Sequence, residues 1–266
     1  MSHSMLASPT PAPYLGGKRN LARRVIARIE AIPHRTYAEP FVGMGGVFLR
    51  RSRPAPAEVI NDLSADVANL FRILQRHYVQ LMDTLRWQVT SRAEFTRLCA
   101  ANADTLTDLE RAARFLYLQR LAFGGKVRGR TFGIDPRSPG RFDVNKLGPQ
   151  LEAIHDRLSG VVIERLHYAE FLSRYDRPET LFYLDPPYFG NEGDYGEDAF
   201  SRADFERLAE VLAGLKGRFL LSLNDHPEVR RIFAGFQIEE VDVTYTVGSR
   251  IGCGARRGEV LISGPA

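Results

Sequence analysis

One short stretch constrains the fold of this chain more than any other. Residues 181–184 are all apolar or aromatic, and Asp185, Pro186, Pro187 and Tyr188 follow them directly. A continuous apolar run is typical of a parallel strand covered on both faces, and proline cannot continue a central strand because it has no N–H to donate. The strand is predicted to end at Asp185, at the carboxyl edge of an α/β sheet, where such sheets bind ligands. We interpret the four residues as a ligand site; the alternative is a strand end with a Pro-Pro turn.

The rest of the pattern predicts an α/β fold around that strand. Helical spacing of apolar residues covers 20–32, 65–121 and 147–158, and a further helix begins near residue 201. Predicted strands cover 58–62, 161–166 and 219–223, with a closing hairpin at 238–247 and 259–263. A strand, a glycine loop and a helix are expected across 37–49.

The chain divides into a sheet-forming part and a helical insertion. Residues 71–160 show no strand alternation, so they are predicted to be an insertion between 14–70 and 161–266. Residues 1–13 are small, polar and rich in proline, and we expect them to be a disordered leader.

The net charge of +4 is unevenly distributed. From Arg111 to Lys146 there are nine basic residues and two acidic ones, so this segment carries +7 and the remainder −3. A dense basic block with glycines and aromatic residues between the charges is typical of a protein that binds a polyanion. The alternative is a solvated basic face without a partner.

Two glycine motifs lie near the start of the chain. Gly16-Gly17-Lys18 is a turn whose lysine can point at a carboxylate or phosphate. The alternative is a plain turn at the entry to the following helix. The second motif, within 41–46, contains Gly43 and Gly45 and has the spacing G-x-G-G. A nicotinamide cofactor fits poorly, because its loop has the spacing G-x-G-x-x-G.

An acidic residue ends the next predicted strand. Asp62 follows Gly46 by 16 residues, close to where a ribose-binding carboxylate falls after a glycine loop. The alternative is an N-cap, for which Asp62 or Ser64 is suitable. Both interpretations stay open from the residues alone.

The composition favours a soluble intracellular protein. Cys99 and Cys253 form no CxxC pair, as is usual in a reducing compartment. No apolar run approaches the length of a membrane span, and there is no signal pattern. The sequence shows no His/Cys/Asp cluster with metal-ligand spacing, so no metal is expected.

The motifs occur in a characteristic order: Y-L-G-G-K at 14–18, E-P-F-V-G-M-G-G-V-F at 39–48, N-D-L at 61–63, the basic insertion, and D-P-P-Y at 185–188. Together they resemble the amino-methyltransferases of DNA, in the order found in the adenine group that modifies GATC. The resemblance implies S-adenosylmethionine on a Rossmann-like, seven-stranded sheet. It also implies that 71–160 is the target-recognition subdomain.

The resemblance assigns roles to single residues. It places Tyr14, Lys18, Phe41, Gly43 and Gly45 around the methionine part of S-adenosylmethionine. It places Asp62 on the ribose hydroxyls, and Asp185, Pro186, Pro187 and Tyr188 around the target base, with Asp185 also next to the cofactor.

The resemblance extends to a loop in the insertion. Residues 123–128 are similar to a family F-N-G-x-x-R loop whose arginine reads a guanine, which here is Arg128. Gly124 replaces the asparagine, so the recognition sequence stays open. Lys126, Arg128 and Arg130 alternate, and in a strand-like tip they would face DNA together.

The chemistry follows from the residue types. A carboxylate that accepts an N–H bond from an exocyclic amine opposes the positive charge that develops on nitrogen during methylation, and Tyr188 offers a face for stacking a flipped base. We predict a site-specific DNA adenine-N6 methyltransferase; the alternatives are a cytosine-N4 enzyme, an RNA substrate, or a catalytically idle nucleic-acid-binding protein.

We expect a monomer in a bacterial or phage-infected cytoplasm that acts on double-stranded DNA, with a restriction endonuclease as a compatible partner.

Overall fold

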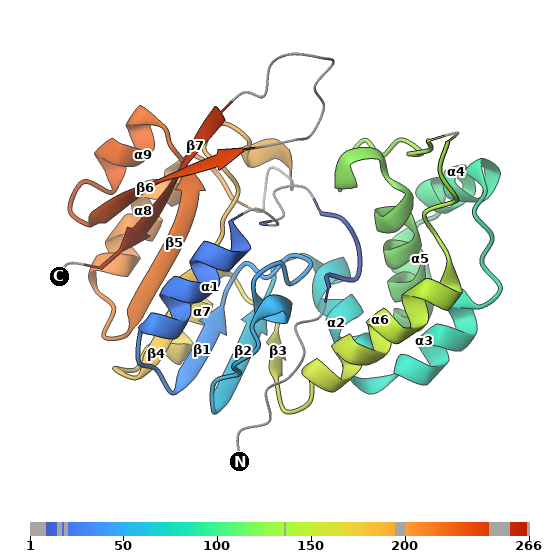
Figure 1. The fold of residues 1–266 in the computed structure, drawn as a ribbon, viewed down its shortest axis with the longest axis horizontal. Helices are drawn as coiled ribbons and strands as arrows, with labels where there is room; N and C mark the ends of the chain where they lie inside the picture. The colour runs from blue at the N-terminus through green and yellow to red at the C-terminus, as the bar shows by residue number, and fades with distance from the viewer. Residues whose placement is uncertain are drawn as a thin grey trace.

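The computed structural model describes residues 9–14, 18, 21–135, 137–194, 200–244 and 256–264. In this part of the chain seven strands form one sheet in the order β3-β2-β1-β4-β5-β7-β6 (Figure 1). The strands are β1 (Thr36–Glu39), β2 (Ala57–Asn61), β3 (Val162–Glu164), β4 (Thr180–Leu184), β5 (Arg218–Asn224), β6 (Gln237–Thr244) and β7 (Arg256–Ser263). β3, β2, β1, β4 and β5 are parallel, and β7 runs antiparallel to both β5 and β6. The predicted α/β sheet and its closing hairpin are confirmed.

The central strand β4 shows why this sheet is covered on both sides. All five of its residues are buried. Leu181 and Tyr183 belong to the hydrophobic core on one face, whereas Phe182 and Leu184 belong to the core on the other. Successive side chains of a strand point to opposite faces, so a continuous apolar run requires two apolar layers around it.

Helices supply both layers. α1 (Ala22–Ala31) and α2 (Ala65–Arg76) contribute to one core, and α7 (Tyr168–Tyr175), α8 (Ala203–Ala213) and α9 (Pro227–Ile232) contribute to the other. Figure 1 shows α1 in front of the sheet and α8 and α9 behind it. β4 lies beside β1, and the loops that follow these two strands bring the predicted site residues to one edge.

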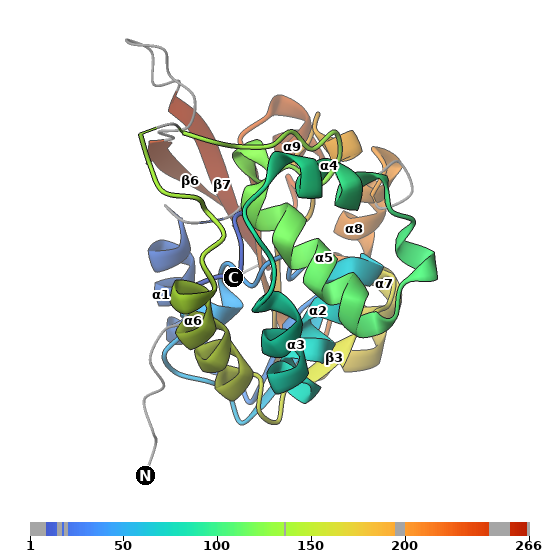
Figure 2. The ribbon, with the colours of Figure 1, turned by 90° about the vertical axis from the view of Figure 1, so that its right-hand side faces the viewer.

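A block of helices separates β2 from β3 along the chain. It contains α2, α3 (Tyr78–Leu85), α4 (Arg92–Ala100), α5 (Asp108–Leu121) and α6 (Val144–Arg157), with short 3₁₀ turns at Ala103–Thr105 and Phe123–Gly125. In Figure 1 the helices α3–α6 lie beside the sheet, and in Figure 2 they face the viewer. The apolar residues of these helices belong to the same core as α1 and one face of the sheet.

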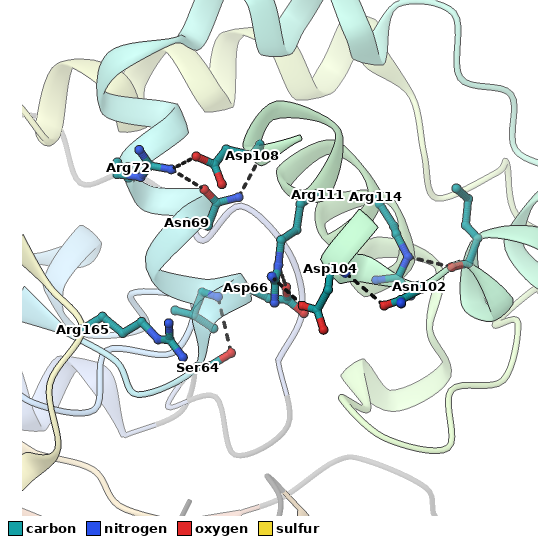
Figure 3. Close-up of polar contacts among 12 residues, drawn as sticks. Ser64, Asp66, Asn69, Arg72, Asn102, Asp104, Asp108, Arg111, Arg114 and Arg165 are labelled. Carbon is teal, nitrogen blue, oxygen red and sulfur yellow. Dashed lines mark hydrogen bonds and ion pairs between the residues drawn. The ribbon is translucent and has the colours of Figure 1, made fainter. Parts of the chain in front are cut away.

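Polar contacts join α5 to α2 across this block (Figure 3). Arg111 Nε donates to Asp66 Oδ1 at 2.5 Å, and Arg111 Nη1 lies 3.3 Å from Asp104 Oδ1. Asn69 Nδ2 donates to the carbonyl of Asp108 at 2.7 Å, and Arg72 forms an ion pair with the same aspartate. The helices are therefore fixed by charge pairs as well as by apolar contacts.

Part of the basic block between Arg111 and Lys146 serves this internal purpose. Besides Arg111, Arg114 donates to the carbonyl of Leu98 at 2.7 Å. Arg120 donates to the carbonyl of Pro11 at 2.7 Å, and burial lowers the pKa of its guanidinium. The interpretation of the whole block as a polyanion footprint was therefore too broad, because three of its nine bases hold the helical segment together.

The structure differs from the predicted elements at several places. The helix expected after the glycine loop is a single 3₁₀ turn, Phe48–Arg50, and the short helices α7 and α9 were not predicted. Residues 126–130 have irregular backbone in place of a strand-like tip. In the expected leader, Ala12 is buried and the carbonyls of Pro11 and Pro13 accept hydrogen bonds from α5.

Candidate active site

The glycine loop after β1 forms one wall of the site. Gly43 and Gly45 have positive φ values of 51° and 72°, which residues with a side chain adopt only at a cost. A Cβ on Gly43 would lie 3.2 Å from ring carbons of Tyr14, so the tyrosine ring lies against this loop. Phe41 lies in an aromatic group, 5.7 Å from the Tyr168 ring centroid and 5.8 Å from that of Phe200.

Asp62 joins this loop to the end of β2. Its Oδ2 accepts a hydrogen bond from the Gly43 N–H, and its Oδ1 accepts one from the Ser64 N–H, both at 2.9 Å. Burial raises the pKa of Asp62 to about 6. The N-cap of α2 is Ser64, whose hydroxyl accepts from Val67 N–H, so the N-cap interpretation of Asp62 was wrong. Each carboxylate oxygen retains a lone pair for a ligand hydroxyl.

The adjacent Asn61 holds three loops in register. Its Nδ2 donates to the carbonyls of Pro40 and Leu166 at 2.9 and 3.1 Å, and its Oδ1 accepts from Leu166 N–H at 2.7 Å. The side chain is buried. The ends of β1, β2 and β3 are thereby fixed relative to one another, and Asp62 with them.

Asp185 lies at the centre of a second group of charges at the same edge. Its Oδ1 is 3.0 Å from Lys18 Nζ and accepts a hydrogen bond from Ser222 Oγ at 3.1 Å. Lys18 Nζ also lies 3.4 Å from Glu259 Oε2 and donates to the Tyr188 hydroxyl. One buried cation is shared by two carboxylates, and we call Lys18, Asp185 and Glu259 the catalytic-edge cluster.

The environment of Asp185 adjusts its proton affinity. Burial raises the pKa of Asp185 to about 6, Lys18 opposes that rise, and the negative charge of Glu259 adds to it. At neutral pH the group is therefore mostly ionised and can accept hydrogen bonds. Its Oδ2 accepts no hydrogen bond from the residues that the structure describes, and the side chain is 19% exposed, so this oxygen is available to a ligand.

Tyr188 completes the site with a flat face. Lys18 Nζ lies 4.1 Å from the centroid of its ring. Burial, followed by the negative charges of Asp185 and Glu259, raises the pKa of Tyr188 far above its usual value, so the hydroxyl remains protonated. Pro186 is buried and Pro187 partly buried, and together they hold the chain extended between Asp185 and Tyr188.

The structure separates the three basic residues predicted to contact DNA. Lys126 and Arg128 are exposed. Arg130 points inward, because its guanidinium lies 5.7 Å from the Phe115 ring centroid and Nη2 donates to Gln119 Oε1 at 3.3 Å. Burial lowers the pKa of Arg130. The expectation that all three share one face was wrong.

Comparison with known proteins decides the family. A model for the D12 class N6 adenine-specific DNA methyltransferases matches residues 14–247. The chain belongs to this family. The methyltransferase is 25% identical over 268 residues to the type II methyltransferase M1.LlaDCHI of Lactococcus lactis subsp. cremoris, covering 94% of this chain and 93% of the relative. It is 25% identical over 264 residues to the DNA adenine methylase of Vibrio cholerae serotype O1, with the same coverage of both chains.

A more distant relative has a viral source. The type II methyltransferase M.CviBI of Paramecium bursaria Chlorella virus NC1A is 21% identical over 212 residues, covering 79% of this methyltransferase and 81% of the relative. Family membership identifies the activity as methylation of adenine N6 in DNA. The predicted resemblance and the adenine activity are confirmed, and the cytosine-N4 and idle alternatives are not favoured.

Two residues of the methyltransferase site were missed by the sequence analysis. Glu259 comes from β7, 241 residues after Lys18, and no local pattern connects them. Asn224 ends β5, where its Oδ1 accepts from Phe189 N–H at 2.9 Å and its Nδ2 donates to Phe189 O at 3.1 Å. A polar residue at the end of a buried parallel strand is the signal that identified Asp185, and it could have identified Asn224 as well.

Among the described residues, no three or more His, Cys, Asp or Glu side chains are grouped so as to hold a metal ion. The helices of the described ranges are too short or too polar for any of them to span a bilayer.

Proposed function

We propose that the methyltransferase takes S-adenosylmethionine as methyl donor and transfers the methyl group to an adenine held at Asp185, Pro186, Pro187 and Tyr188. The observation that carries the proposal is that Asp185 Oδ2 accepts no hydrogen bond from any described residue, while its other oxygen is fixed by Lys18 and Ser222.

The residues at the sheet edge fit a cationic nucleoside donor. The glycine loop brings backbone close to Tyr14, and Asp62 retains acceptor capacity for two ribose hydroxyls. Phe41 lies on the same loop and offers an apolar surface. When bound, S-adenosylmethionine would supply a methyl group on a sulfonium, whose S–CH3 bond breaks to release the neutral thioether S-adenosylhomocysteine.

The side chain of Lys18 supports a different role from the one that the resemblance implied. Its ammonium contacts Asp185, Glu259 and Tyr188, whereas its backbone nitrogen lies 3.6 Å from where a Cβ on Gly46 would be. We assign Lys18 to holding the catalytic carboxylate, and its backbone to the cofactor loop. An ammonium 3.0 Å from Asp185 favours the ionised carboxylate.

The residues around the adenine amine act on its lone pair and protons. Asp185 Oδ2 accepts one N6–H bond and the carbonyl of Pro186 accepts the other, which draws the nitrogen out of conjugation with the ring. As the methyl group arrives, the carboxylate opposes the positive charge on nitrogen, and Oδ2 then takes the departing proton. The ring of Tyr188 supports the base after it leaves the duplex.

We assign DNA recognition to residues 71–160, with Lys126 and Arg128 as the contacts. Both are exposed on the loop after α5, and we call residues 123–130 the recognition loop. Arg128→Ala should cost about 1–3 kcal/mol on the methylated sequence and little on a mismatched one, whereas Lys126→Ala should weaken binding to all duplexes alike. Equal losses of methylation rate on both duplexes would reduce Arg128 to a backbone contact.

The direct test is product analysis. Purified protein is incubated with S-adenosylmethionine and genomic DNA that lacks methylation, and the DNA is digested to nucleosides for mass spectrometry. N6-methyldeoxyadenosine is expected, and Asp185→Ala serves as the negative control. N4-methyldeoxycytidine, or no methylated nucleoside despite DNA binding, would contradict the proposal. The monomeric state, the cytoplasmic location and a restriction endonuclease partner stay predictions from the sequence.

A further inference from the structure

A fully buried glutamine joins the recognition loop to the chain that precedes α1. Gln119 is 0% exposed. Its Nε2 donates to the Gly125 carbonyl at 2.6 Å and to the Pro13 carbonyl at 3.0 Å, and its Oε1 accepts from Arg130 Nη2 at 3.3 Å. This amide therefore connects Gly125 and Arg130 of the recognition loop with the Pro13–Tyr14 segment.

The recognition loop also lies so close to that segment that Gly125 has no room for a side chain. A Cβ on Gly125 would lie 2.9 Å from the Tyr14 backbone nitrogen and 3.0 Å from the Pro13 carbonyl carbon. The neighbouring Gly124 has a similar φ, +66° against +68°, yet a Cβ there would meet nothing within 4 Å. Of these two glycines, Gly125 is the one whose neighbours leave no room for a side chain.

The opposite side of Tyr14 contacts the cofactor loop. Its ring carbons lie 3.2 Å from where a Cβ on Gly43 would be, and the Gly43 N–H is bound by Asp62. A single residue, Tyr14, thus separates the recognition loop from the loop that we assign to the cofactor. The hydrogen bonds from Gln119 to Gly125 and Pro13 would carry a shift of the recognition loop on DNA to the Tyr14 backbone.

We propose that Gln119 and Gly125 are positioning residues that couple DNA recognition to cofactor binding through Pro13 and Tyr14. DNA bound at the recognition loop tightens Tyr14 on Gly43 and so raises cofactor affinity, and bound cofactor raises DNA affinity by the same factor. The coupling rests on the proposed function, since it needs DNA at Arg128 and a cofactor at Asp62. It makes the enzyme bind its donor best when the target sequence is in place.

The two glycines provide a matched test. The dissociation constant of S-adenosylhomocysteine, which carries no transferable methyl group, is measured by calorimetry with and without a saturating duplex. The duplex carries the sequence that the wild-type protein methylates in host DNA, identified by single-molecule sequencing. The wild type should bind at least about fivefold more tightly with DNA, at the lower end of usual couplings. Gly125→Ala should reduce this ratio to within about twofold of one, while Gly124→Ala, with the same backbone strain, should retain it.

A second pair of variants keeps the test decisive if Gly125→Ala fails to fold. Gln119→Leu removes the bonds to Pro13 and Gly125 and also the bond from Arg130. Its control is Gln75→Leu, since Gln75 Nε2 likewise donates to two backbone carbonyls, those of Leu158 and Val161, at 2.8 Å each. Both variants should lose similar stability, and Gln119→Leu alone should lose the coupling.

The outcomes separate the inference from the proposed function. A wild type that methylates no adenine would refute the proposed function itself. A wild type that methylates adenine but binds S-adenosylhomocysteine equally with and without DNA would overturn the coupling. The coupling would also be overturned if DNA changed the dissociation constant of S-adenosylhomocysteine by the same factor in Gly125→Ala and Gly124→Ala. The same holds if that factor were equal in Gln119→Leu and Gln75→Leu.

Discussion

Two buried groups of charges lie near opposite ends of the parallel strands, and they differ in composition and access. The catalytic-edge cluster has one cation and two carboxylates, and Asp185 in it is 19% exposed. The other group, which we call the amino-edge cluster, has two cations and one carboxylate: Arg51 and Arg157 both bind Glu58, at 2.8 and 2.5 Å. All three of its side chains are at most 5% exposed.

The surplus charge is used differently in each cluster. In the amino-edge cluster the guanidinium of Arg51 lies 3.8 Å from the Tyr37 ring centroid, and that of Arg157 lies 4.0 Å from the Phe48 centroid. These rings cover the positive groups, and Arg51 Nη2 also donates to the Arg53 carbonyl at 3.2 Å. The catalytic-edge cluster has one more carboxylate than it has cations. Within it, Asp185 Oδ2 accepts no hydrogen bond from any described residue. The amino-edge cluster, which is buried throughout, stabilises the fold. The catalytic-edge cluster has an oxygen available for a ligand and can act on a substrate.

Removing the shared carboxylate of the closed cluster should have the largest effect on stability. Glu58→Ala leaves two arginines buried without a counter-charge, and we expect a loss of about 3–5 kcal/mol in the free energy of unfolding, measured by urea denaturation. The control is Glu179→Ala, because the Glu179 side chain forms an exposed ion pair with Arg35 at 3.8 Å; the loss in this variant should stay below about 1 kcal/mol. Equal losses in both variants would show that Glu58 contributes no more than a surface charge.

Asp62, an acid at the catalytic edge to which no described residue supplies a cation, should affect ligand binding instead. Asp62→Ala removes the acceptor proposed for the ribose, so S-adenosylmethionine affinity should fall by about 1–3 kcal/mol in calorimetry. Asp62→Asn keeps the size and one acceptor oxygen, and should lie between Asp62→Ala and the wild type. Unchanged affinity in both variants would remove Asp62 from the cofactor site.

The smallest effects on the methylation rate should come from Ser222 and Glu259, the two neighbours that adjust the pKa of Asp185. Ser222→Ala removes a donor to the carboxylate, which raises the pKa of Asp185, so the acid limb of the rate profile should move to higher pH. Glu259→Gln removes a negative charge that raises this pKa, so the acid limb should move to lower pH. Each displacement should be below about one pH unit, which corresponds to about 1.4 kcal/mol. Single-turnover rates against pH measure both, and displacements in the same direction would contradict the charge arrangement.

The sequence predicted the central strand and its site because that signal is local. Residues 181–188 combine a fully buried strand with two prolines and an acid, and no distant residue is needed to recognise this pattern. The closing hairpin was predicted from two strand-like runs and was found as β6 and β7. The short helices α7 and α9 were missed, since eight and six residues give little periodicity.

Contacts between distant parts of the chain could not be predicted in this way. Lys18 and Glu259 meet only because the sheet places β7 beside β5. Arg130 alternates with Lys126 and Arg128 in sequence, but Phe115 and Gln119 draw it inward. Charge counting therefore overstated the basic surface, because it cannot distinguish an arginine that faces solvent from one that holds two helices together.

The central claim is that the ionised carboxylate of Asp185 acts on the adenine amine, and single-turnover methylation with saturating cofactor and DNA tests it most directly. Because burial raises the pKa of Asp185 to about 6, protonation removes the acceptor at low pH. The wild-type rate should be constant above this pKa and fall about tenfold for each pH unit below it. At pH 8, Asp185→Ala should be slower by at least about a hundredfold, or about 2.7 kcal/mol in the barrier, while calorimetry shows S-adenosylmethionine still bound. A variant that retains more than about a tenth of the wild-type rate, a loss under about 1.4 kcal/mol, would contradict the account.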